Sequence, residues 1–139
     1  MTKIILAFVA ALSLTQAVHA AAQIQATPET TIQNQESVST QDYTSHWFGR
    51  VFVNSYNPVR WTITNTGDEN LDYASSNLFG SFDFRARHNC TGTLLPGQHC
   101  QIEIVYWPAF EGADSGDFLL NFKQDTVQIH VWGEAVKHF

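Results

Sequence analysis

The chain has 139 residues, a formal net charge of −6 at pH 7 and 7 lysine and arginine residues that form no cluster. This length fits one domain, and the acidic balance argues against nucleic acid and anionic lipid, which both require a basic surface. After residue 20 no apolar stretch approaches the about 18 residues of a membrane span, so we expect a soluble product without membrane insertion.

Residues 1–20 have the pattern of a secretory signal peptide. Lys3 is followed by apolar residues 4–14, and the small residues Val18 and Ala20 suit cleavage after Ala20. The apolar segment is too short to cross a bilayer. We therefore expect export from a bacterial cytoplasm, with the periplasm as the destination and the extracellular side or cell surface as the alternative.

Residues 21–44 are rich in Gln, Thr, Ser and Ala, with few large apolar residues such as Ile24 and Ile32. This composition buries too little apolar surface to offset the entropy of ordering, so it predicts a disordered tail or flexible linker. Thr and Ile also favour extended structure, so an alternative is that this segment adds as a strand to a partner's sheet. Both interpretations stay open at this point.

From Trp47 onward, short runs alternate apolar and polar residues between turn signals, which is an all-β pattern. In one run Val59, Trp61 and Ile63 share a face. We expect about seven strands, packed as an immunoglobulin-like antiparallel β-sandwich over residues 45–135, with a short C-terminal tail at 136–139. The expected strands cover residues 48–53, 59–65, 71–73, 82–86, 100–106, 117–122 and 126–132.

The two cysteines, Cys90 and Cys100, flank a reversal of the chain. In an exported protein an even cysteine count normally means a disulfide. Leu95-Pro96-Gly97-Gln98 fits a type II turn, with proline at the second position and glycine at the third. The turn brings the ends of two successive strands together, so a bond between the cysteines would close this loop and stabilise the domain by roughly 3 kcal/mol.

Several short motifs follow one another along the chain: FGxV at 48–51, NTG at 65–67, LPGxxC at 95–100, IxIxYxP at 102–108 and VxIxVxG at 127–133. Taken in order, they resemble the ASH family of immunoglobulin-like domains (abnormal-spindle and hydin type). This family is close to bacterial choice-of-anchor modules and the major sperm protein fold. Asn54 stands where such domains often have glycine. The resemblance implies an interaction or scaffolding module without catalytic residues.

No motif indicates a cofactor or a catalytic centre. His88 and His99 flank the cysteines and are weak candidates for a copper or zinc site, although their spacing is not that of a ligand pair. The acidic run at 111–117 lacks the order of a calcium loop, and its DSG at 114–116 is a serine-protease motif without the accompanying histidine context. We expect no enzyme activity.

Trp107 and Trp132 alternate out of step with their inward-facing neighbours, so we expect both to be partly exposed. Together with Tyr43 they are the candidate partner-binding residues. The favoured function is a non-catalytic, exported interaction or structural module of a bacterial envelope or appendage assembly, such as a flagellar or secretion system. A carbohydrate-binding or adhesin module is the first alternative, and a periplasmic copper- or zinc-binding protein is the second. The sequence does not define the oligomeric state.

Overall fold

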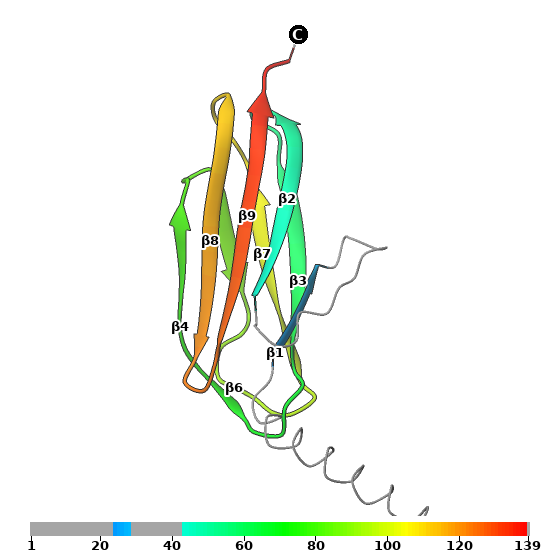
Figure 1. Cartoon of the computed structure of the whole chain (residues 1–139), viewed down its shortest axis with the longest axis vertical. Coiled ribbons are helices and arrows are strands. Elements are labelled where there is room, and N and C mark those ends of the chain that lie inside the picture. The colour runs from blue at the N-terminus through cyan, green and yellow to red at the C-terminus, as the bar shows by residue number, and fades with distance from the viewer. Residues whose placement is uncertain (1–23, 29–42, 139) are drawn as a thin grey trace, which may run out of the picture.

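The computed structural model describes residues 24–28 and 43–138, and within these ranges the chain forms nine strands and no helix (Figure 1). The predicted signal peptide and most of the predicted linker therefore lie outside the described residues. No helix in the described part of the chain could cross a membrane. The strands are β1 (Ile24–Pro28), β2 (Tyr43–Phe52), β3 (Asn57–Asn65), β4 (Leu71–Gly80), β5 (Phe84–His88), β6 (Thr93–Leu94), β7 (His99–Tyr106), β8 (Gly112–Phe122) and β9 (Thr126–Val136).

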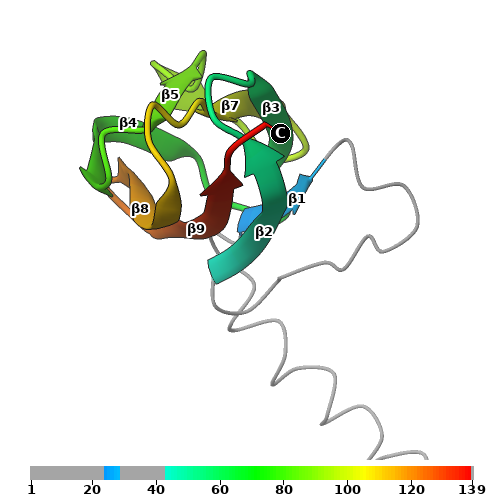
Figure 2. The same ribbon diagram turned by 90° about the horizontal axis from the view of Figure 1, so that it is seen from above.

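The strands form two sheets that pack face to face, which confirms the predicted β-sandwich (Figure 2). One sheet has the order β1-β3-β7-β5 and the other the order β2-β9-β8-β4-β6. The pairing is antiparallel except between β2 and β9, which run parallel. β2 begins at Tyr43 and β9 continues to Val136, so the sheets extend slightly beyond the predicted domain limits.

The structure differs from the linker prediction at β1. This strand pairs antiparallel with β3, from Ile24 opposite Asn65 to Pro28 opposite Trp61, and Ala26 is fully buried. Composition pointed to a linker because the segment carries little apolar surface. The edge of β3 offers backbone hydrogen-bond donors and acceptors, and a polar strand pairs with them as well as an apolar strand does. The segment therefore completes the sheet of its own chain.

Alternating residues of the strands fill the space between the sheets, as predicted. The largest fully buried side chain is Trp61 on β3, and the ring of His46 on β2 meets it edge-on with ring centroids 5.8 Å apart. The other large, fully buried apolar side chains are Ile63, Leu71, Ile102, Ile104, Tyr106, Leu120, Val127, Ile129 and Val131. This core fixes the outward direction of every intervening side chain.

The turn and the disulfide form as predicted. Gly97 has a φ of 87°, and the Gln98 N–H donates to the carbonyl of Leu95 at 2.9 Å. Cys90 and Cys100 are bonded, with their Cα atoms 5.1 Å apart. The bond joins Cys90, two residues after the short edge strand β5, to Cys100 at the start of β7, so it ties the end of β5 to its neighbouring strand.

Asn54 occupies the turn between β2 and β3 with a φ of 70°. This is the left-handed region, which asparagine tolerates better than most residues other than glycine. Asparagine can therefore occupy this turn at the position where the resemblance led us to expect glycine. The Asn54 N–H donates to the carbonyl of Pro108 at 2.7 Å, which ties this turn to the loop between β7 and β8.

Candidate docking surface

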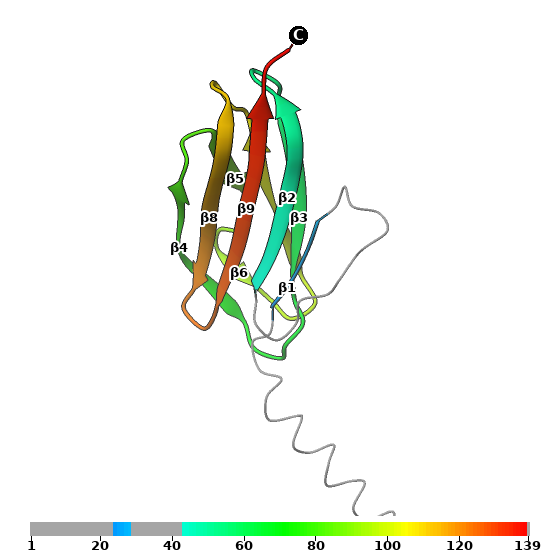
Figure 3. The same ribbon diagram turned by 45° about the horizontal axis from the view of Figure 1, so that its top comes forward.

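The strands β2, β9 and β8 lie side by side in the five-stranded sheet (Figure 3). Residues on their outer face line a hollow. The register of the parallel pair places Trp47 opposite Trp132 and Ser45 opposite His130. Tyr43 begins β2 on the same face, because it alternates with Ser45 and Trp47. We call the surface formed by Tyr43, Trp47, His130 and Trp132 the aromatic groove; its hollow has a volume of about 560 Å³.

The rings of the aromatic groove pack on one another yet remain open to solvent. The Trp47 and Trp132 ring centroids are 5.8 Å apart, and His130 stacks on Trp132 at 5.4 Å. Tyr43 is 40% exposed, Trp47 46% and Trp132 37%. The groove thus offers large, rigid aromatic area that the described part of the chain leaves uncovered, which is the composition of binding hot spots.

Polar groups border these rings. The Nδ1 atom of His130 lies 2.9 Å from the Asp117 carboxylate, which also accepts a hydrogen bond from Gln128. At the upper end of the groove Arg50 pairs with Glu134 at 3.3 Å. The groove therefore combines aromatic ring faces with both hydrogen-bond donors and hydrogen-bond acceptors.

Ser45, His130 and Asp117 lie in one row across β2, β9 and β8. These are the residue types of a serine hydrolase, in which the serine hydroxyl is hydrogen-bonded to the histidine that activates it. Among the described residues no hydrogen bond joins the Ser45 hydroxyl to His130, whose ring instead stacks on Trp132.

A partly buried polar contact supports the floor of the groove. The Tyr106 hydroxyl donates to Asp114 at 2.7 Å, and Ser81 donates to the other oxygen of the same carboxylate at 2.8 Å. Burial and the Asp114 hydrogen bond raise the pKa of Tyr106, so the phenol remains protonated. Gly133 lies against the Tyr106 ring, where a Cβ atom would come within 2.5 Å of a ring carbon. A side chain at 133 would therefore displace the floor.

Trp107 does not belong to the aromatic groove. It follows β7 on the outer side of the four-stranded sheet, where its ring meets Tyr56 at 5.3 Å and the Arg85 guanidinium at 5.6 Å. It is 44% exposed, as expected, but the two tryptophans singled out from the sequence lie on different sheets. The structure brings Tyr43 and Trp132 together and separates Trp107 from them.

The two histidines considered for metal binding do not converge. His88 pairs with Ile102 of β7, and both side chains face inward. His99 lies three residues before Ile102 on β7 and therefore faces outward. The Nδ1 atom of His88 accepts a hydrogen bond from the Cys90 N–H at 3.0 Å, and its Nε2 atom contacts Ser76 at 3.1 Å. Both ring nitrogens are therefore occupied. Within residues 24–28 and 43–138 no group of three potential ligands lies together.

Trp47 is a groove residue that the sequence analysis did not select. The predicted strand begins at residue 48. It therefore leaves out the preceding residues, in which Tyr43, Ser45 and Trp47 alternate with Thr44 and His46. This alternation is the signal that would have found it. Only the pairing of β2 with β9 shows that Trp47 and Trp132 are neighbours.

A family model described as "HYDIN/CFA65/VesB-like, Ig-like domain" matches residues 37–134. The chain belongs to this family. The match confirms the ASH-type resemblance and the immunoglobulin-like fold that the sequence motifs predicted. No curated protein sequence matches the chain.

Solved structures with the same fold include two protease chains. The secreted serine protease VesC from Vibrio cholerae is 20% identical over 65% of this chain and 21% of that chain, with a TM-score of 0.52. The Vibrio cholerae VesB protease is 17% identical over 66% of this chain and 30% of that chain, with a TM-score of 0.53. The ASH/PapD-like domain 7 of human CEP192 is 12% identical over 68% of this chain and 82% of that chain, with a TM-score of 0.48.

The chain spans 21% of VesC and 30% of VesB, so it corresponds to a minor part of each protease. At these identities the likeness shows the fold alone. The function must be argued from the surface of this chain.

Proposed function

We propose that this protein is an exported, non-catalytic module that binds a protein partner within a bacterial envelope or appendage assembly. A flagellar or secretion-system accessory protein is one form of this role. The observation that carries the proposal is the aromatic groove, where Trp47, Trp132 and Tyr43 remain partly exposed in the described structure. Membership of an immunoglobulin-like family without a conventional active site supports it.

Export is supported by three independent features. The first 20 residues have the composition of a signal peptide, and the Cys90–Cys100 disulfide suits an oxidising compartment. VesC, whose fold is similar, is a secreted protein. Periplasmic material whose intact mass corresponds to a chain starting at Ala21 would support this proposal; a full-length chain confined to the cytoplasm would contradict it.

The interaction is tested by photo-crosslinking in the native cell. A benzophenone amino acid is placed at Ser115, an exposed position that lines the aromatic groove, and the matched control carries it at Asn77 on the same face of β4. We expect a discrete adduct from position 115 that is absent from position 77. The role would be refuted if the two positions gave the same products.

Alanine variants then locate the contact. Truncating a buried aromatic hot spot costs about 2 kcal/mol or more, which is about a 30-fold loss of affinity. The double variant Trp47→Ala/Trp132→Ala should therefore lose the position-115 adduct while its thermal midpoint stays close to that of the wild type. The Trp107→Ala variant is the control, because Trp107 lies on the other sheet, and it should retain the adduct.

A carbohydrate-binding or adhesin role is the second candidate. It is favoured by the same rings, since Trp47 and Trp132 lie beside the hydrogen-bonding groups of Ser45, Asp117 and His130. Sugars are bound by such a combination of ring stacking and polar contacts. A glycan array that gives a signal lost in Trp132→Ala would favour this role over a protein partner, and a blank array would remove it.

A further inference from the structure

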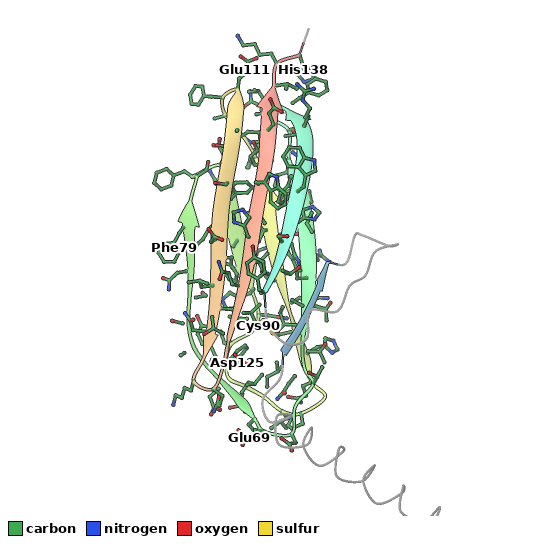
Figure 4. All side chains as sticks on the ribbon, viewed as in Figure 1. Glu69, Phe79, Cys90, Glu111, Asp125 and His138 are labelled. Carbon is green, nitrogen blue, oxygen red and sulfur yellow. A yellow bond between two sulfur atoms is a disulfide. The ribbon has the colours of Figure 1, made fainter. Side chains whose placement is uncertain are left out.

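Three phenylalanines outside the aromatic groove are strongly exposed. Phe79 is the next-to-last residue of β4 and is 55% exposed, Phe82 lies in the β4–β5 turn and is 95% exposed, and Phe110 lies in the β7–β8 loop and is 79% exposed. Figure 4 shows Phe79 projecting away from the sandwich beside β4. We call these three residues the phenylalanine surface. Phenylalanine is among the residue types most often buried, so side chains exposed to this degree are candidates for contact with a partner.

The backbone that carries Phe82 is held in one conformation by its neighbours. The Ser81 N–H donates to the carbonyl of Ser115 at 2.9 Å, and the Ser81 hydroxyl accepts from the Asp83 N–H at 3.1 Å. Gly80 has a φ of 107° and approaches Ser115 so closely that a Cβ atom would lie 2.5 Å from its carbonyl oxygen. The outward direction of Phe82 is therefore fixed by the turn.

The two loops that carry Phe82 and Phe110 are joined to each other. The Trp107 N–H, in the β7–β8 loop, donates to the carbonyl of Asp83 at 2.8 Å. The same loop is tied to the β2–β3 turn through the carbonyl of Pro108. A pre-formed pair of loops loses little conformational entropy on binding, which favours tight association.

The charges beside these rings indicate what they bind. Each fully projecting phenylalanine is followed by a carboxylate, Asp83 after Phe82 and Glu111 after Phe110, and neither carboxylate forms an ion pair in the described part of the chain. Glu111 lies at the end of the sandwich where the C-terminus leaves (Figure 4). Lys137 follows β9 towards the same end, so this end of the sandwich carries both a positive and a negative side chain. Carboxylates one residue along the chain from each ring, on a chain of net charge −6, oppose anionic lipid headgroups and favour basic protein side chains.

We infer that the phenylalanine surface is a second docking site, and that its occupant is a partner protein with apolar pockets bordered by lysine or arginine. Phe82 and Phe110 enter the pockets, and Asp83 and Glu111 pair with the basic rim. The inference deepens the proposed interaction role but uses a surface separate from the aromatic groove. One chain with two such sites would connect two components of an assembly.

The test uses the full exported protein with a benzophenone amino acid at Phe82 or at Phe110. The matched control carries it at Leu95, an exposed apolar residue in the turn between β6 and β7 at the opposite end of the sandwich. We expect the same single protein adduct from positions 82 and 110 and none from position 95. Asp83→Lys/Glu111→Lys should reduce both adducts about tenfold with an unchanged thermal midpoint, and the crosslinked partner peptide should contain lysine or arginine.

Four results would overturn the inference: no adduct, an adduct of twice the chain mass that identifies a second copy, adducts from position 95 equal to the others, or adducts unaffected by charge reversal. Flotation with phosphatidylethanolamine–phosphatidylglycerol vesicles that is lost in Phe82→Ala/Phe110→Ala would also overturn it, because it identifies a bilayer as the occupant. The Trp47→Ala/Trp132→Ala variant should retain the adducts at 82 and 110. The two docking sites therefore succeed or fail separately.

Discussion

Breaking the Cys90–Cys100 disulfide is expected to destabilise the domain by an amount that follows from its loop length. The two residues are 10 apart in sequence. For a loop this short, the chain-entropy relation gives about 3 kcal/mol of stabilisation, because the cross-link restricts the unfolded chain. In a domain of this size, a loss of about 3 kcal/mol lowers the thermal midpoint by about 12–24 °C.

The native contacts around the bond should survive reduction. The Asn89 N–H donates to the carbonyl of Gln101, and the Asn89 side chain accepts from the Gln101 N–H at 2.8 Å, so two hydrogen bonds still join the strands. The free energy of unfolding is measured by urea titration of the oxidised protein and of the same protein with dithiothreitol. This comparison leaves every side-chain volume almost unchanged, so it isolates the contribution of loop closure to the free energy of unfolding.

The Cys90→Ala/Cys100→Ala variant is the control for the reductant. It should be as unstable as the reduced protein or slightly more so, because both sulfurs lie in the core, and it should not respond to dithiothreitol. Oxidised and reduced proteins that unfold within about 0.5 kcal/mol of each other would refute the loop-closure reasoning. Labelling of native, unreduced protein by a maleimide would refute the bond itself.

Three further predictions concern the groove floor, the histidines and catalysis. Gly133→Ala places a Cβ atom 2.5 Å from the Tyr106 ring, so urea unfolding should show a loss of about 2–3 kcal/mol, whereas a loss below about 0.5 kcal/mol would contradict the close approach. Burial lowers the pKa of both His46 and His88 from 6.5, so the unfolded chain binds more protons. The free energy of unfolding should therefore be constant above about pH 7 and fall as the pH drops through 6.5, and His46→Gln/His88→Gln should flatten this slope. A fluorophosphonate probe should leave Ser45 unlabelled in intact-mass spectra, because no imidazole is hydrogen-bonded to its hydroxyl, and a stoichiometric adduct would show a catalytic serine.

The candidate docking residues show how far a sequence can lead towards a site. Alternation along a strand correctly predicted that Trp107 and Trp132 are partly exposed, since each follows an inward-facing residue. Alternation assigns a side chain to one face of its own strand but does not say which strand lies next to it. For this reason the sequence could not show that Trp132 meets Trp47 while Trp107 lies on the other sheet.

The sequence by itself determined the features that depend on local chemistry. Apolar alternation set the all-β class and the inward residues such as Trp61, and the Pro96-Gly97 pair set the turn that brings Cys90 to Cys100. These features follow from side-chain period and backbone preference within a few residues.

Only the tertiary structure decided the features that depend on strands distant in the chain. It placed β1 on the edge of β3 and joined β2 to β9 in parallel, which created the aromatic groove. It also put His88 and His99 on opposite faces of their sheet. The reason is physical: backbone hydrogen bonds between strands carry almost no sequence information, and the pairing is selected by how the whole core packs.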